Sequence, residues 1–133
     1  MDATTVYVEA EINPTESEQK VKQAIENIFG NVQTRVQTMR RGGMMTAEAT
    51  DHEALTKLYN LLRRERISAA ARKAFFEGLN GKTISFCLNK QVAYAGHISF
   101  SQEEAESPLG PIKVRIVCEN PRELIEWLTP RIL

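Results

Sequence analysis

Hydrophobic and polar positions alternate along residues 5–12, where every second residue is apolar. This two-residue period predicts a strand with one buried face. The segment Asn13-Pro14-Thr15-Glu16 then has the chemistry of a helix start, because Asn caps free amides and Pro suits the first turn. Apolar residues follow at helical spacing as far as Gly30-Asn31, which predicts a helix end. The residues of this predicted apolar face are Val21, Ala24, Ile25, Ile28 and Phe29.

The middle of the chain predicts a hairpin followed by helical segments. Residues 32–41 and 44–50 fit two strands joined at Gly42-Gly43. Asp51 is suited to cap the next helix. A second helical stretch covers residues 67–79, and one bent helix and two separate helices both fit the pattern. The apolar stripe of the first of these helices is Leu55, Leu58, Tyr59 and Leu62.

The last third predicts another hairpin, a last strand and a last helix. Residues 83–88 and 92–100 alternate, and Asn89-Lys90-Gln91 is expected to form the turn between them. A polar, acidic loop over 101–107 and the rigid Pro108-Leu109-Gly110-Pro111 follow. The last strand is expected around Ile112, Val114 and Ile116, and the last helix from Asn120-Pro121-Arg122-Glu123, with Leu124, Trp127 and Leu128 facing inward.

Both ends of the chain show a strand, an Asn-Pro-x-Glu segment and an amphipathic helix. Two readings fit: an internal pseudo-repeat, or the general suitability of Asn-Pro for starting a helix. Strands arranged in hairpins with helices between them predict an α+β fold. We expect one domain over residues 1–133, with a mainly antiparallel sheet and helices packed on one face.

The composition changes this picture little. The chain has 133 residues, 42% hydrophobic and 26% charged, which is typical of a globular domain. No apolar run is long enough to span a bilayer, and no secretory signal is visible, so we expect a cytoplasmic protein without membrane contact. Cys87 and Cys118 lie in apolar strand-like segments and are expected to be free buried thiols rather than a disulfide.

The formal net charge is zero, but the charges are unevenly distributed. Residues 1–30 carry six acids and two bases, a balance of −4. Residues 31–100 carry eleven bases and five acids, a balance of +6, and the remainder carries a balance of −2. The sequence leaves open whether this basic middle forms one side of the surface or is mixed evenly with the acids in space.

Candidate catalytic residues do not form a recognisable group. Neither His52 nor His97 has a second ligand at metal-binding spacing, and no serine has a nucleophile motif. The acids Glu103, Glu104 and Glu106 lie in the hydrophilic loop, whereas catalytic acids need partial burial. We therefore expect no enzyme activity, no metal and no cofactor. A small-molecule enzyme, the third hypothesis, would require a deep pocket.

Basic residues give the one positive indication of function. Arginine suits phosphate because its planar fork binds two oxygens at once. On a continuous helix at ~100° per residue, Arg63, Arg66 and Lys73 would fall within about 80° of one another. A solvated helix face is the alternative interpretation. The candidate phosphate-contacting residues are Arg35, Arg40, Arg41, Arg63, Arg64, Arg66, Arg72, Lys73 and Lys90.

Several motifs resemble a family of small uncharacterised archaeal proteins over nearly the whole chain. The most specific are the Asn89-Lys90-Gln91 segment and the Ser107-Pro108-Leu109-Gly110-Pro111 loop, together with Leu62-Arg63-Arg64-x-Arg66-Ile67 and Ala71-Arg72. The resemblance implies a ribosomal-protein-like fold, similar to the RNA-binding domain of the large-subunit protein that holds 5S ribosomal RNA. It implies no established activity. His97 departs from the lysine expected in relatives.

These observations lead to two functional hypotheses. The first is a non-enzymatic RNA-binding or RNA-associated protein, in which an arginine-rich face contacts the phosphates of structured RNA. The second is a protein-interaction module that forms a homodimer through a free sheet edge, without binding nucleic acid. A shared face for Arg35, Arg41, Arg63 and Arg66 would favour the first hypothesis.

Overall fold

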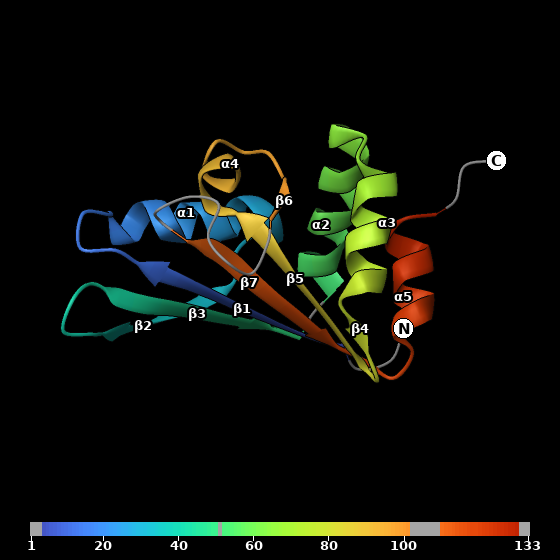
Figure 1. Cartoon of the computed structure of the whole chain (residues 1–133), viewed down its shortest axis with the longest axis horizontal. Helices are drawn as coiled ribbons and strands as arrows, with labels where there is room; N and C mark the ends of the chain where they lie inside the picture. The colour runs from blue at the N-terminus through green and yellow to red at the C-terminus, as the bar shows by residue number, and fades with distance from the viewer. Residues whose placement is uncertain (1–3, 51, 102–109, 131–133) are drawn as a thin grey trace.

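Seven antiparallel strands form one sheet in the computed structural model, which describes residues 4–50, 52–101 and 110–130. The helices cover one face of this sheet (Figure 1), which confirms the expected α+β class. The strand order is β2-β3-β1-β7-β5-β4, and β6 pairs with β5. The elements are β1 (Thr5–Ile12), α1 (Glu18–Phe29), β2 (Gln33–Thr38), β3 (Gly43–Ala49), α2 (His52–Glu65), α3 (Ser68–Glu77), β4 (Leu79–Asn80), β5 (Thr83–Asn89), α4 (Lys90–Tyr94), β6 (Phe100–Ser101), β7 (Pro111–Val117) and α5 (Pro121–Leu128).

The core lies between the sheet and its helices. Val8 of β1 pairs with Ala47 of β3 on one side and Val114 of β7 on the other, so the inward side chains of the central strands meet in rows. The predicted apolar stripe of α1 is buried against them, including Ile25 and Ile28. The alternation read from the sequence therefore identified the buried face of β1 and β7 correctly.

Two separate helices, rather than one bent helix, fill residues 52–77. Helix α2 ends at Glu65, and Arg66 adopts a left-handed backbone with φ 55° before α3 begins at Ser68. Helix α3 also ends earlier than residue 79, because Leu79 and Asn80 form the short strand β4 against β5. Arg63, Arg66 and Lys73 thus do not share a continuous helix, and the angle expected between them does not apply.

The predicted hairpin with a turn at residues 89–91 is wrong. The side chain of Asn89 accepts a hydrogen bond from the Val92 N–H at 3.0 Å and caps the short helix α4. Of the expected returning strand over residues 92–100, only Phe100 belongs to a strand, which it forms with Ser101 against β5. A helix cap and a hairpin turn both favour Asn, and the local sequence did not distinguish them.

The two Asn-Pro-x-Glu segments behave differently. Asn120 caps α5 by accepting from the Glu123 N–H, as predicted. Asn13 instead belongs to a turn in which its backbone N–H and side-chain amide both donate to the Glu16 carboxylate at 2.9 Å, and α1 begins only at Glu18. Only the second segment therefore forms the helix start that the sequence predicted for both. Asp51 and the loop over 102–109 lie outside the described residues.

A buried lysine joins distant parts of the chain. The Lys90 ammonium donates to the Glu11 backbone oxygen at 2.7 Å and to the Glu16 carboxylate at 2.9 Å. Its side chain is only 4% exposed, and that of Glu16 is 12% exposed. Because a buried ammonium needs compensating partners, this pair fixes the start of α4 against the turn that leads from β1 into α1.

We predict that Lys90→Met destabilises the fold by roughly 3 kcal/mol, because it leaves the Glu16 carboxylate without its buried cation. Urea unfolding at neutral pH measures this change. The matched control is Lys82→Ala, which breaks an ion pair with Glu119 whose side chains are 62% and 64% exposed. This substitution should lower the free energy of unfolding by less than about 1 kcal/mol. Equal effects of the two variants would contradict a structural role for Lys90.

The pH dependence of stability provides a second prediction. Burial opposes ionisation of Glu16, but hydrogen bonds from Asn13 and Lys90 outweigh it and lower its pKa below 4.5. A carboxyl group whose pKa is lowered in the folded state stabilises the fold at pH values above its ordinary pKa. This stabilisation is lost as the pH falls through the lowered pKa. The free-energy difference between the native protein and Glu16→Gln should therefore shrink below about pH 4.5. An unchanged difference at pH 3 would refute this.

Candidate nucleic-acid interface

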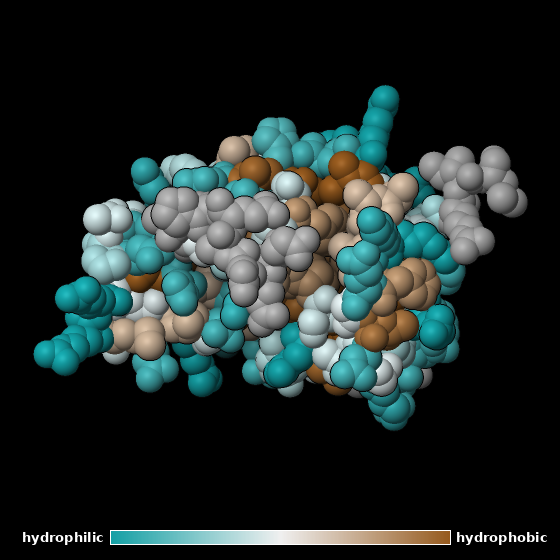
Figure 2. Space-filling model, in the orientation of Figure 1, coloured by the Kyte–Doolittle hydropathy of each residue, from teal (hydrophilic) through white to brown (hydrophobic). Residues whose placement is uncertain are grey.

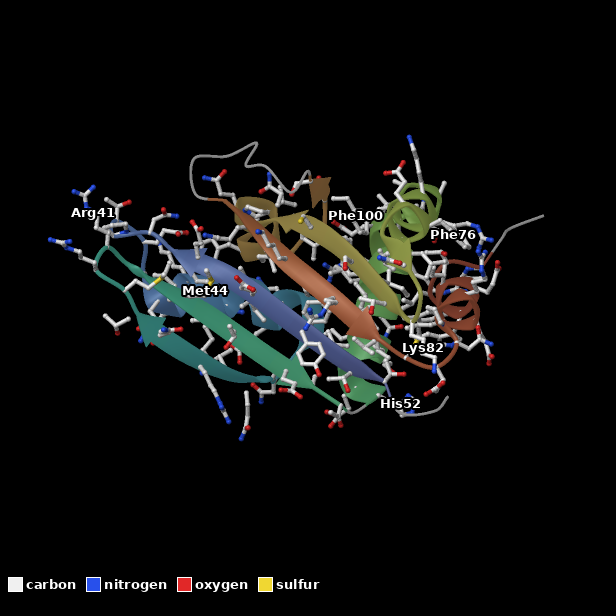
Figure 3. The ribbon with its side chains drawn as sticks, turned by 60° about the horizontal axis from the view of Figure 1, so that its bottom comes forward. Arg41, Met44, His52, Phe76, Lys82 and Phe100 are labelled. Atoms are coloured by element: carbon white, nitrogen blue, oxygen red, sulfur yellow. The ribbon has the colours of Figure 1, made fainter. Side chains whose placement is uncertain are left out.

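The β2–β3 hairpin presents three exposed arginines. Arg40 and Arg41 occupy its tip, where the Met39 N–H donates to the Gly42 oxygen at 3.0 Å. Arg35 lies on β2 opposite Thr46, on the sheet face away from the helices. Figure 3 places Arg41 at the far end of the sheet from Lys82. Within the described part of the chain, none of these arginines forms an ion pair.

The conformation of the hairpin tip depends on Gly42. Its φ of 77° is a left-handed backbone that favours glycine. A Cβ at this position would lie 2.0 Å from the Ile12 oxygen, so the turn packs directly on the end of β1. The tip is thus held close to the sheet, and Figure 2 shows hydrophilic side chains projecting from this end of the molecule. The sequence predicted the hairpin but extended its first strand to residue 41, whereas β2 ends at Thr38, Arg40 and Arg41 lie in the turn, and Gly43 already belongs to β3.

A second group of arginines lies where α2 ends. Arg63 packs over the Tyr59 ring at 4.8 Å, and that ring stacks on Trp127. Arg64 donates to the Gly96 oxygen and lies 3.8 Å from the Glu65 carboxylate. Arg66 is exposed in the connection to α3. Figure 1 places this end of α2 away from the tip of the β2–β3 hairpin, so the basic residues form two groups rather than one face.

Two of the predicted phosphate contacts are engaged within the fold. Arg72 makes a forked pair with the Glu126 carboxylate and also donates to the Thr129 oxygen at 3.1 Å. This hydrogen bonding to Glu126 raises the pKa of Arg72. Lys90 is buried, as described above. The sequence predicted both as phosphate contacts without indicating these partners, which lie far away in the sequence. Lys73 is exposed and lies 4.0 Å from Glu77.

The outward face of the sheet lines a wide, open pocket, which the sequence did not predict. Register places Glu48, Tyr7, Arg115 and Ser85 in one row across the strands. The Arg115 guanidinium lies 4.9 Å from the centre of the Tyr7 ring. The strand order of the folded sheet brings these residues together. Acids and bases are interspersed on this face, so it lacks the single sign of the hairpin tip.

Groups suited to catalysis or metal binding are sparse in the described residues. No cluster of three or more His, Cys, Asp or Glu side chains there is suited to hold a metal. His97 pairs with Glu65 at 2.7 Å on the surface, and His52 is exposed at the start of α2. Cys118 is buried, which raises the pKa of its thiol, and Cys87 is half-buried. Over the same residues, no helix combines the length and the apolar character that crossing a bilayer requires.

Comparison with known proteins places the chain in a family. A family model described as RNA binding matches residues 5–118. The chain is 44% identical over 128 residues to a UPF0201 protein of Sulfurisphaera tokodaii, covering 96% of this chain and 88% of that one. It has the same identity to a UPF0201 protein of Sulfolobus acidocaldarius.

Solved structures agree. A crystal structure of an uncharacterised UPF0201 protein has a TM-score of 0.84 and 33% identity, covering 96% of this chain and 94% of that one. The UPF0201 protein of Methanococcus jannaschii has a TM-score of 0.86 and 30% identity, covering 97% and 95%. The chain therefore belongs to the UPF0201 family, and to the family whose model is described as RNA binding.

Proposed function

We propose that this protein binds structured RNA, and that the arginines of the β2–β3 hairpin supply the principal phosphate contacts. The observation that carries the proposal is the group formed by Arg35, Arg40 and Arg41. Residues 31–47 contain no acid, and the three guanidinium groups are exposed and without ion pairs among the described residues. Unpaired arginines arranged along a hairpin can each release counterions from a phosphate backbone.

The description of the matching family model as RNA binding supports this proposal independently of the geometry. Arg63, Arg64 and Arg66 form a second group that a large, folded RNA could reach as well. Contacts to phosphate carry no base readout, which favours recognition of RNA shape over sequence. The ribosomal-protein-like comparison, the cytoplasmic location and the absence of catalysis remain predictions from the sequence.

We predict that Arg40→Ala combined with Arg41→Ala weakens binding to a structured RNA hairpin and flattens its salt dependence. Each lost phosphate contact should reduce the slope of log affinity against log salt by about 0.7–0.9. Fluorescence anisotropy titrations over a series of salt concentrations measure this slope for the native and variant proteins.

The matched control is Lys82→Ala combined with Arg122→Ala, which removes the same charge from exposed positions on other elements. This control should keep the native slope. If both double variants lose affinity equally, the hairpin has no special role and the attraction is diffuse. A native protein whose affinity does not fall as salt rises would overturn the phosphate-contact proposal altogether.

Arg72 provides a contrasting prediction. Because its guanidinium is held by Glu126 and the Thr129 oxygen, Arg72→Gln should lower the thermal midpoint and leave the RNA affinity of the folded protein unchanged. Thermal unfolding and the same anisotropy titration separate these effects. Loss of RNA affinity at a temperature where the variant is fully folded would assign Arg72 to the interface instead.

A further inference from the structure

Strand β2 forms one edge of the sheet, and little covers it. It is the terminal strand in the sheet order, with β3 on one side only. Every residue of β2 except Thr34 is exposed, on both faces of the strand. Natural sheets usually protect an edge with a proline, a bulge, a lysine or a short strand. Over its six residues, β2 has no proline or lysine, and its pairing with β3 is regular from Gln33 to Thr38.

Exposed apolar side chains gather at this edge. Among the described residues, the large hydrophobic side chains with high exposure are Val36 at 39%, Met39 at 51% and Tyr94 at 46%. Two of these three belong to β2 or to the turn that follows it. Val36 lies opposite the buried Met45, so it points to the helix side of the sheet and yet remains exposed. This edge therefore combines free peptide groups with apolar surface.

The hydrogen-bond pattern identifies which peptide groups are free. Met39 and Gly42 are joined by a hydrogen bond at the turn, and pairing with β3 continues in the same register. Hydrogen-bonded pairs alternate along antiparallel strands, so Gln37 and Arg35 direct their peptide groups toward β3. Thr34, Val36 and Thr38 must then direct theirs away from the sheet. These are the groups that an additional strand would meet.

We propose that β2 pairs antiparallel with β2 of a second copy, about a two-fold axis at Val36. This interface does not depend on the proposed RNA binding. The axis places Val36 against the partner's Val36, and Thr34 against the partner's Thr38. All three outward-facing positions then form reciprocal hydrogen-bonded pairs. The two Val36 side chains then meet at the centre of the interface, on the helix side of the sheet, where no helix covers β2.

Charge selects this register over its neighbour. Centring the axis on Arg35 would place two guanidinium groups directly opposite each other, which is destabilising. Centring it on Val36 places Arg35 opposite the partner's Gln37, so no like charges face each other within the strand. The arrangement is isologous, because the same strand of each copy forms the interface. The opposite edge of the sheet is unsuited to pairing with a further copy, because β4 has only two residues and β6 pairs with a separate short part of β5. The assembly therefore closes as a dimer.

Charge variants at the axis test the proposal. Light scattering at high micromolar concentration should give a dimer for the native protein. Val36→Lys and Val36→Glu should each give a monomer, because like charges face across the axis. Mixing the two variants should restore a dimer, since opposite charges then meet. A monomeric native protein, a dimeric lysine variant, or a mixture that stays monomeric would each overturn the proposed axis.

A cysteine pair provides a check that does not rely on adding charge. Equivalent residues at the axis would have Cα atoms about 5.5 Å apart, which is within disulfide range. Val36→Cys should thus form an intermolecular disulfide under oxidising conditions. The matched control is Thr34→Cys on the same strand and face, where equivalent residues lie about 14 Å apart in this register. Cross-linking of Thr34→Cys with equal yield, or of neither variant, would refute the register.

Discussion

The sheet buries one face beneath helices, and this constraint determines where the surface features of the protein lie. Helices pack over the central strands, so inward residues such as Ile116 and Ile84 are fully buried. The cover stops short of β2, whose residues remain exposed on both faces. The exposure of Val36 on the helix side of the sheet follows from this incomplete cover, because a strand packed beneath a helix would bury its inward side chains.

The sequence predicted the regular, locally determined parts of this fold well. The α1 stripe, the strand at 112–116 and the Asn120 cap all depend on spacing within a few residues, and each is confirmed. The basic tip of the hairpin was also predictable, since a glycine pair marks the turn and the arginines adjoin it.

For Lys90 and Arg72, the sequence interpretation missed contacts with residues far apart in the chain. Lys90 reads as a turn residue, but its burial depends on Glu11 and Glu16, more than 70 positions earlier. Arg72 reads as a surface charge, but its partner Glu126 belongs to the last helix. No local signal identifies such partners, and only the assembled fold brings them together.

The contact between Gly42 and the Ile12 oxygen has a consequence for the thermodynamics of recognition. A flexible arginine loop would lose backbone conformational entropy when a ligand ordered it, and this loss would offset much of the electrostatic gain. Because the turn already packs on the end of β1, that ordering has occurred during folding. A turn ordered in this way would favour the proposed RNA binding without any added contact, because binding would remove less conformational entropy.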